Sequence, residues 1–534
     1  MIIADQHCPP PTLCSWNGVS SAVSSDGVHF TDLGVVLRKD CAGGQRHASE
    51  LGPQAPNCAT WMGSGSVWPL LQQQQPEDDG ADEAGEWVMN FSQEYDCQDS
   101  CAGGTNSSAC NCQSIFFATS KDLLSWTPVA PNAEQHPSTD VFKYDTSKYF
   151  SPGANPTSSR WDCMSAIPRP GGGYYAYWTA SPISDAGSCH GPQPGPPNWT
   201  RSCGAGFGES DDGLHWRALP SPGPTYASAE LGGVAVINGS VFMLFDEGHL
   251  FRADSPKGPF LPVEHNFAFL DQSVGVGFPR FWGSVYTGSG DLTLLTHNQL
   301  LRETTYAALT KRVELGADGV LRAVWWSGND ALRGAPLLIV PAANVPLGHH
   351  AAEVRSNTAV AAAAAAFNRT ACLGQCLTSG LWIEGTLALG VLSGVWLQTN
   401  SSSSSVDGYD MDTSTSLGGV GFAFDTRSGV FRMGASPSPA EANCTSAAGC
   451  MPTVVNRSMH IAQGQPLTFR LVVRNSWSDA TMVEWYVNDV LGQAFSVGNR
   501  GSQAAEAARF SGVFAVMGGA EVAAVHSLTL PVQR

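Results

Sequence analysis

Short apolar segments recur along the chain from Val19 to Trp326 and are separated by clusters of Gly, Pro, Asp and Ser. Tyr174–Trp178 and Val241–Phe245 are typical, because each is too short for a buried helix and is rich in aromatic or β-branched residues. Their length and the turn residues that bound them predict β-strands. We therefore expect an all-β fold in this part of the chain.

A turn motif recurs directly after such segments. Ser24–Phe30 reads SSDGVHF, Ser120–Trp126 reads SKDLLSW and Ser210–Trp216 reads SDDGLHW, while Ala253–Phe260, ADSPKGPF, is a looser fourth copy. Each copy joins a polar turn to an aromatic residue, which is typical of a hairpin whose aromatic side chain packs inward. Three similar copies with matched flanking strands indicate an internal repeat rather than a coincidence of common turn residues.

Two further strands precede each later copy of the motif. The second, third and fourth units contain Ser66–Leu70 and Trp87–Phe91, Met164–Ile167 and Tyr174–Trp178, and Gly232–Ile237 and Val241–Phe245. A fifth unit contains Arg280–Val285, Leu292–Thr296, Tyr306–Lys311 and Leu321–Trp326. Four antiparallel strands per repeat are typical of a β-propeller blade. The sequence predicts a five-bladed β-propeller over residues 1–345, with an incomplete first blade.

The pattern changes after this region. Residues 346–375 contain the alanine-rich segment Ala351–Phe367, which favours a linker with helical character because alanine is the best helix former. Beyond it, Thr468–Val473, Met482–Val487 and Arg509–Val516 alternate between apolar and polar residues, as strands packed on a second sheet do. We expect residues 376–534 to form a C-terminal β-sandwich.

Composition narrows the function classes. The 534 residues carry 28 Lys and Arg against 46 Asp and Glu, a formal net charge of -18, so a nucleic-acid partner is not expected. No apolar run approaches the roughly 20 residues that a membrane span needs, so no membrane partner is expected either. The oligomeric state is left open. The sequence contains no phosphate-binding Gly-rich loop, no Gly-x-Ser-x-Gly motif and no His-Glu-x-x-His helix, and no metal or cofactor is expected.

Cysteines and sequons favour the secretory pathway. The 15 cysteines include close pairs, and eight Asn-x-Ser/Thr sequons occur, at Asn90, Asn106, Asn198, Asn238, Asn368, Asn400, Asn443 and Asn456. Disulfides are favoured over zinc for Cys97, Cys101, Cys110 and Cys112, because their spacing is not that of a zinc knuckle. No signal peptide follows Met1 and the cysteine count is odd, so we expect a missing N-terminal segment. A free thiol in a cytosolic protein is the alternative.

Two carboxylates lie just before the predicted first strands of neighbouring blades, where a propeller collects polar groups around its central funnel. Asp162 precedes the third blade's strand and Glu230 the fourth blade's. Their apolar or small neighbours favour a desolvated carboxyl group with a raised pKa, which suits a general acid, and a carboxylate pair suits glycoside cleavage. The alternative is structural: Asp162 caps a turn or pairs with Arg160, and Glu230 neutralises a nearby cation.

The order of these features resembles glycoside hydrolase family 32, the invertases and fructan hydrolases. Gly63–Val67 is similar to the family's start of blade two, the Ser-x-Asp turns to its repeated turns, and Val483–Asn488 to a strand of its C-terminal sandwich. The resemblance is distant but covers nearly the whole chain. It implies a retaining two-carboxylate hydrolase of sucrose or fructans, and a secreted, cell-wall or vacuolar glycoprotein with disulfide bonds.

The resemblance also implies roles for individual residues. The family's Arg-Asp-Pro motif falls on Arg160-Trp161-Asp162, which implies that Asp162 binds sugar hydroxyls, and its Glu-Cys motif falls on Glu230-Leu231, which makes Glu230 the acid/base. Trp161 intervenes in the first motif, and the usual cysteine after the glutamate is absent. The nucleophile motif Asn-Asp-Pro is also absent, and Asp5 is a poor substitute for it.

Tryptophans near the funnel suit sugar stacking, although packing in the blade core is the commoner role for each: Trp61, Trp68, Trp161 and Trp178. With Arg160, we expect Trp68 and Trp161 to bind substrate. A related propeller glycosidase that acts on pentose-containing polysaccharides is an alternative function. A carbohydrate-binding protein without activity is another, because the nucleophile motif is missing.

Overall fold

The structure is a computed structural model of the 534-residue chain. It describes residues 2–5, 18–38, 61–63, 65–71, 85–96, 111–129, 142, 145–149, 160–180, 182–183, 205–222, 230–245, 249–263, 269, 276–282, 293–301, 304–336, 338–341, 351–355, 380–390, 392–399, 419–435, 453–458, 465–475, 481–497, 510–517 and 520–528. Most of the cysteines singled out above, including Cys97, Cys101 and Cys110, lie outside these residues. No helix in the described part of the chain is long and apolar enough to cross a membrane.

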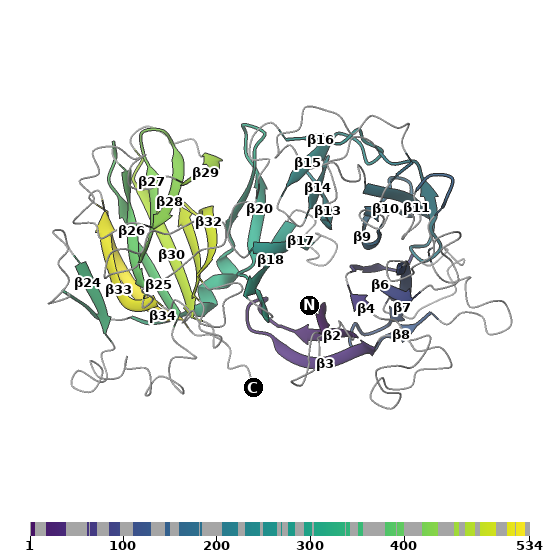
Figure 1. Cartoon of the computed structure of the whole chain (residues 1–534), viewed down its shortest axis with the longest axis horizontal. Coiled ribbons are helices and arrows are strands. Elements are labelled where there is room, and N and C mark those ends of the chain that lie inside the picture. The colour runs from purple at the N-terminus through teal and green to yellow at the C-terminus, as the bar shows by residue number, and fades with distance from the viewer. Residues whose placement is uncertain are drawn as a thin grey trace, which may run out of the picture.

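The predicted all-β class is confirmed. In the N-terminal half, four separate sheets and one end of a larger sheet are arranged in a ring (Figure 1). The first sheet comprises β1 (Ile2–Asp5), β2 (Gly18–Val23) and β3 (Thr31–Arg38). The second comprises β4 (Trp61–Gly63), β5 (Val67–Pro69), β6 (Trp87–Asp96), β7 (Asn111–Ser120) and β8 (Thr127–Pro128).

The next sheets supply the strands that position the site. One comprises β9 (Trp161–Pro168), β10 (Tyr174–Ala180), β11 (Ala205–Ser210) and β12 (Arg217–Leu219). Its neighbour comprises β13 (Leu231–Ile237), β14 (Ser240–Phe245), β15 (Leu250–Ala253) and β16 (Leu261–Pro262). Both are antiparallel, and β9 and β13 lie at their edges and pack against each other.

The ring continues into an eleven-stranded sheet. Its first strands are β17 (Val276–Trp282), β18 (Thr293–Leu301), β19 (Thr304–Ala307), β20 (Lys311–Leu315) and β21 (Leu321–Trp325). The 3-10 helix η2 (Ser327–Leu332) follows β21. The predicted strand Tyr306–Lys311 is wrong in its bounds, because β19 ends at Ala307 and β20 begins at Lys311.

The C-terminal half contains two sheets that share one apolar core. The first continues the eleven-stranded sheet with β22 (Arg333–Pro336), β25 (Gly380–Leu387), β30 (Leu467–Asn475), β31 (Thr481–Val487), β32 (Val490–Val497) and β34 (Glu521–Leu528). The second contains β23 (Leu338–Pro341), β24 (Ala351–Arg355), β26 (Leu392–Thr399), β27 (Gly419–Asp425), β28 (Val430–Ala435), β29 (Thr453–Ser458) and β33 (Phe510–Met517). Ile383 and Trp485 of the first sheet pack with Phe422 and Phe431 of the second, so the two faces bury each other.

The alanine-rich segment differs from its prediction where the structure describes it. Ala351–Arg355 is not helical; it forms β24, which is hydrogen-bonded to β23 and β33. The partner strands satisfy its backbone groups, which outweighs the helix propensity of alanine. The division of the chain at residues 345 and 375 stays a prediction.

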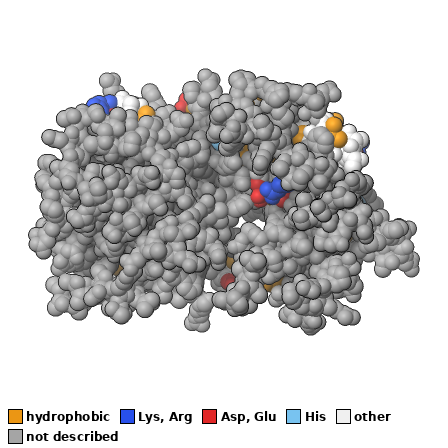
Figure 2. All heavy atoms as spheres, in the orientation of Figure 1, with side chains coloured by type: hydrophobic (Ala, Val, Ile, Leu, Met, Phe, Trp, Pro, Cys, Tyr) orange, Lys and Arg blue, Asp and Glu red, His pale blue; other side chains and the backbone are white. Residues whose placement is uncertain are grey.

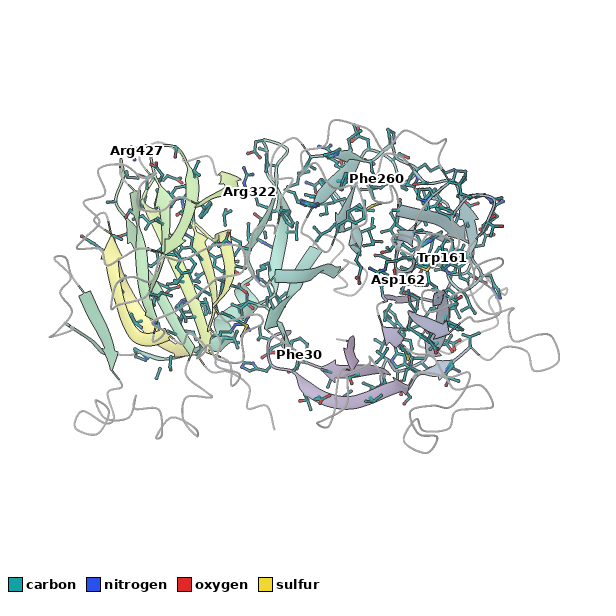
Figure 3. The ribbon with its side chains drawn as sticks, viewed as in Figure 1. Phe30, Trp161, Asp162, Phe260, Arg322 and Arg427 are labelled. Atoms are coloured by element: carbon teal, nitrogen blue, oxygen red, sulfur yellow. The ribbon has the colours of Figure 1, made fainter. Side chains whose placement is uncertain are left out.

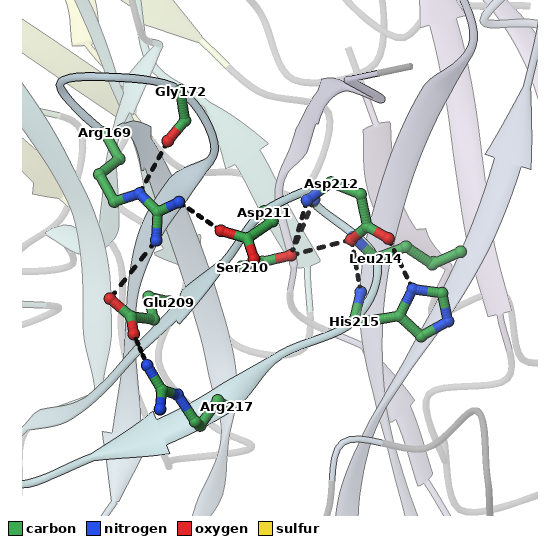
Figure 4. A network of polar contacts seen from close by, with 10 residues as sticks. Arg169, Gly172, Glu209, Ser210, Asp211, Asp212, Leu214, His215 and Arg217 are labelled. Carbon is green, nitrogen blue, oxygen red and sulfur yellow. Dashed lines mark hydrogen bonds and ion pairs between the residues drawn. The ribbon is translucent and has the colours of Figure 1, made fainter. Parts of the chain in front are cut away.

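The repeated turn owes its recurrence to one hydrogen-bond pattern. In the copy at Ser210, the serine Oγ accepts the backbone N–H of Gly213, and Asp212 Oδ1 accepts those of Leu214 and His215 (Figure 4). The copies at Ser24 and Ser120 form the equivalent bonds. The serine and the aspartate thus satisfy turn N–H groups that would otherwise lack partners, which explains why these two residues recur.

Candidate active site

Two adjacent strands from neighbouring sheets carry the candidate site. Ser165 on β9 accepts the backbone N–H of Val234 on β13 through its Oγ, at 3.2 Å. The two strands pack against each other, and Arg160 and Glu230, which precede them, lie close together. Both strands pair irregularly with their neighbours near this end. The pairing of β9 with β10 shifts register between Tyr177 and Thr179, and the pairing of β13 with β14 shifts register between Leu231 and Gly233. Such bulges redirect side chains at a strand end.

Arg160 joins the two predicted carboxylates. Its Nη1 lies 3.1 Å from Glu230 Oε2, and its Nη2 forms an ion pair with Asp162 Oδ2. Residues separated by almost seventy positions in the sequence therefore share one guanidinium group. The Asp162 side chain is fully buried, whereas the Glu230 and Arg160 side chains keep 13% and 37% of their surface exposed. The group is thus open to solvent on the side of Arg160 and Glu230.

The site lies toward the centre of the ring. Figure 3 labels Asp162 on the inner side of its sheet and Trp161 farther from the centre. The space-filling view shows a patch of acidic and basic side chains at the rim of a hollow in the middle of the ring (Figure 2). Asp162 therefore lies on the side of its sheet that faces the centre of the ring.

The electrostatics of the site differ from the sequence expectation. We expected each carboxylate in an apolar setting, but both contact a cation, as the structural alternative proposed. Burial lowers the pKa of Arg160, yet the charges of Asp162 and Glu230 outweigh it and raise that pKa well above its usual value. Arg160 therefore keeps its charge, and the two carboxylates form a stable ion-pair triad with it.

The tryptophans predicted to bind substrate are core residues instead. Trp161 is completely buried and donates its indole N–H to the carbonyl of Phe142 at 2.8 Å. Trp68 is 2% exposed and donates its indole N–H to the carbonyl of Gly213 at 2.9 Å. Trp178, also completely buried, lies with Trp161 in one aromatic cluster. Because neighbouring residues on a strand face opposite sides, Trp161 cannot face the funnel when Asp162 does.

Cys163 is a site residue that the sequence analysis missed. Its Sγ lies 2.9 Å from Glu230 Oε1, and its backbone φ is 55°, in the left-handed region. Strand alternation would place Cys163 on the Trp161 side, away from Glu230, but the left-handed backbone breaks the alternation. The one sequence signal was that Cys163 follows Asp162, at the place where the Arg-Asp-Pro motif of glycoside hydrolase family 32 has its proline.

Thr179 is a second missed residue. It lies on β10, directly opposite Asp162, and its Oγ1 accepts the backbone N–H of Leu231 at 2.9 Å. Leu231 follows Glu230, so this bond fixes the backbone on which Glu230 is carried. A threonine within an apolar strand gave no sequence signal of this role.

Among the residues that the structure describes, the geometry identifies neither a nucleophile nor a metal centre. Asp5 ends β1, where its backbone pairs with Gly18, but its side chain lies outside what the structure describes. Within the described residues, no group of three or more His, Cys, Asp or Glu side chains is placed to hold a metal ion. The site is therefore defined by Arg160, Asp162, Cys163 and Glu230.

Comparisons with known proteins find structural likeness only. No family model matches the chain, and no curated protein matches it in sequence. It is similar to a fructosyltransferase from A. japonicus, with 11% identity, a TM-score of 0.46, and coverage of 97% of this chain and 90% of that chain. It is also similar to an exo-β-1,3-galactanase from Clostridium thermocellum, with 10% identity, a TM-score of 0.35, and coverage of 96% and 92%.

A third similar structure is an exo-1,5-α-L-arabinanase from a bovine ruminal metagenomic library, with 13% identity, a TM-score of 0.30, and coverage of 57% of this chain and 90% of that chain. The predicted resemblance to propeller glycosidases is thus confirmed as a distant structural likeness.

Proposed function

We propose that the protein is a glycoside hydrolase that cleaves the O-glycosidic bonds of fructofuranosides such as sucrose or fructans. The observation that supports this proposal is the sharing of Arg160 by Glu230 and Asp162 near the centre of the ring. Glu230 is partly exposed, so it is accessible to a glycosidic oxygen, whereas Asp162 is buried beneath it. A pair of carboxylates is the minimum equipment for glycoside cleavage.

In this mechanism Glu230 is the general acid/base. It donates a proton to the leaving oxygen and later removes one from the attacking water. Arg160, whose side chain is partly exposed, orients sugar hydroxyls, and the negative charge of the buried Asp162 stabilises the positive charge that develops on the sugar ring. A retaining reaction also requires a nucleophilic carboxylate about 5–5.5 Å from the acid. That residue is not among the four described above.

A matched pair of isosteric variants tests the assignment. Sugar release is measured from sucrose, inulin, levan, an arabinofuranoside and a xyloside. We expect Glu230→Gln to lower kcat by at least a hundredfold, the range typical of a lost general acid. Glu209→Gln is the control, because Glu209 is also paired with arginines, Arg169 and Arg217, but lies on β11 in the outer part of its sheet (Figure 4).

The substrate panel separates the alternatives. Turnover of the fructosides supports the proposal, and turnover of only the arabinofuranoside or xyloside replaces it with the pentose-specific function. Saturable sugar binding by calorimetry without any release identifies a binding protein and rejects the hydrolase. If the wild type is active, the anomer released first, read by NMR, decides whether the reaction retains configuration. Full activity in Glu230→Gln would refute the role of Glu230.

A further inference from the structure

Besides its ion pair with Arg160, Glu230 is positioned by two contacts from the neighbouring sheet, one to its side chain and one to the backbone of the next residue. The Cys163 thiol lies 2.9 Å from Oε1, and Thr179 Oγ1 accepts the N–H of the next residue, Leu231, at 2.9 Å. Cys163 and Thr179 are 2% and 7% exposed. The contacts therefore form inside the protein, where competing water is scarce.

The contact of Cys163 orients the carboxylate of Glu230, and the contact of Thr179 fixes the backbone beside it. The carboxylate has two oxygens: Oε2 faces Arg160, and Oε1 faces Cys163. A neutral thiol is a donor, so an ionised carboxylate accepts from both sides and its plane is fixed. Thr179 fixes the start of β13, so Glu230 cannot move along the axis of the strand. An acid/base residue needs this fixed geometry, because small displacements of a catalytic group cost much of the rate.

The backbone supports a functional reading of Cys163. A φ of 55° is unfavourable for a residue other than glycine, asparagine or aspartate. The sequence places cysteine there and not glycine, and the left-handed backbone is what directs the thiol onto Glu230. Strained conformations of this kind are concentrated at functional sites.

We propose that Cys163 and Thr179 are positioning residues for Glu230, acting through the thiol on its carboxylate and through the hydroxyl on its backbone. This inference rests on the proposed role of Glu230 as the acid/base. It adds two residues from β9 and β10 to a site otherwise defined by charged groups. Neither residue touches the sugar.

Kinetics of four variants test the proposal. Cys163→Ala and Thr179→Val remove the two contacts, and Cys163→Ser and Thr179→Ser keep a hydroxyl at each position. We expect both removals to lower kcat about tenfold with little change in KM, since misplacement affects the reacting geometry rather than sugar binding. The serine variants recover most of that loss.

The pH profile distinguishes positioning from a purely structural role. The thiol donates to the ionised carboxylate, so its removal makes ionisation of Glu230 less favourable. The protonated general acid then persists to higher pH, and the alkaline limb of the kcat profile moves upward in Cys163→Ala but not in Thr179→Val. Ser165→Ala is the matched control, because it removes a hydrogen bond between β9 and β13, at Val234, and leaves the contacts of Cys163 and Thr179 intact.

The S–H stretching band decides the thiol contact without any activity. The wild-type infrared spectrum minus that of Cys163→Ala isolates this one thiol from the other cysteines. We expect the isolated band at lower frequency than in the same difference taken on a Glu230→Ala background, because hydrogen bonding weakens the S–H bond. An identical band in both backgrounds overturns the contact.

The two proposals fail in different ways. Wild-type inactivity on the whole panel refutes the hydrolase, and the infrared band alone then decides whether Cys163 binds Glu230. An active wild type with Cys163→Ala and Thr179→Val no slower than Ser165→Ala, and with an unmoved pH profile, refutes the positioning role and leaves the hydrolase standing.

Discussion

The Nζ of Lys311 on β20 lies 2.9 Å from Oε1 of Glu484 on β31, and both side chains are buried, with 0% and 1% of their surface exposed. Glu484 also accepts the hydroxyl of Tyr486 and the backbone N–H of Leu309. This pair therefore links the ring to the C-terminal sheets through an ion pair inside the protein. Near it, β21 and β32 pair at Val324 and Val490.

We expect Glu484→Gln to lower the free energy of unfolding by about 3–5 kcal/mol, because it leaves the buried ammonium group of Lys311 without its counter-charge. Denaturant unfolding measures the effect. Glu384→Gln is the control: Glu384 is paired with Arg333 and Arg470 but is 23% exposed, so its loss costs about 1 kcal/mol or less. If the two variants lowered the free energy of unfolding equally, burial of the ion pair would not be the cause of the larger loss expected for Glu484→Gln.

Gly213 is a turn position at which an added side chain would be both strained and crowded. Its φ is +92°, and a Cβ there would lie 2.8 Å from Trp68 Nε1. We expect Gly213→Ala to cost about 2–3 kcal/mol, the sum of the left-handed strain and the clash. In Gly239→Ala, only the strain applies, because nothing lies within 4 Å of the added carbon at φ +79°, so about 1 kcal/mol is expected. Thermal unfolding of both compares the terms, and a larger loss at Gly239 would refute this account.

Asp212 makes the fold sensitive to acid. Burial raises its pKa, but hydrogen bonds from the ring and backbone of His215 outweigh it and lower the pKa to about 2. A carboxyl group with a lowered pKa stabilises the fold at pH values above its unfolded pKa of about 3.9, and this stability disappears as the pH falls through about 2.

Asp212→Asn removes the charge but keeps an oxygen that can accept the turn N–H groups. We expect its melting temperature to lie below that of the wild type from pH 5 to 7, by an amount worth about 1 kcal/mol, and to equal it near pH 2. Calorimetry across this range measures both. A gap that persists at pH 2 would show that the carboxylate is not the cause.

Trp68 is expected to affect stability and not sugar binding. It packs against Trp216 and Tyr174 in the core, with ring centroids 5.7 and 6.5 Å away. Trp68→Ala should cost about 3–5 kcal/mol, measured by denaturant unfolding. The KM of the folded fraction should match that of the wild type. A raised KM with unchanged stability would restore the predicted role in substrate binding.

The fold could be predicted from the sequence because its signal is local and repeated. The turns at Ser24, Ser120 and Ser210 form the same side-chain bonds, so one pattern read three times identified three sheets. The prediction for the alanine-rich segment was wrong because its secondary structure depends on the neighbouring strands β23 and β33. Of these, β33 lies far away in the sequence. Propensity carries no information about such partners.

The candidate site was only partly accessible from the sequence. Asp162 and Glu230 could be selected, because Asp162 lies at the start of β9 and Glu230 just before β13, and the structure brings both to Arg160. The contact between Cys163 and Glu230 could not be predicted, because it depends on a left-handed backbone and a bulge that break strand alternation. Trp161 could have been excluded, since alternation places it opposite Asp162.

The sequons also show that a sequence motif does not reveal whether its side chain is buried. Asn90 was counted as a glycosylation signal, but it is 1% exposed and its Oδ1 accepts the N–H of Ser66 at 2.7 Å, so a glycan cannot be attached to the folded protein there. Asn238 is exposed, and with Gly239 it forms the left-handed hairpin turn between β13 and β14, which by itself explains an asparagine at this position. A secreted location stays a prediction.

The pairing of β21 with β32 has a consequence for any attempt to divide the protein. A fragment ending near residue 345 would present the edge of β21 to water as an unprotected template for intermolecular pairing, beside a lysine stripped of its counter-ion. Such a fragment should precipitate rather than fold, and recombinant expression of the chain should succeed only when both halves are made together.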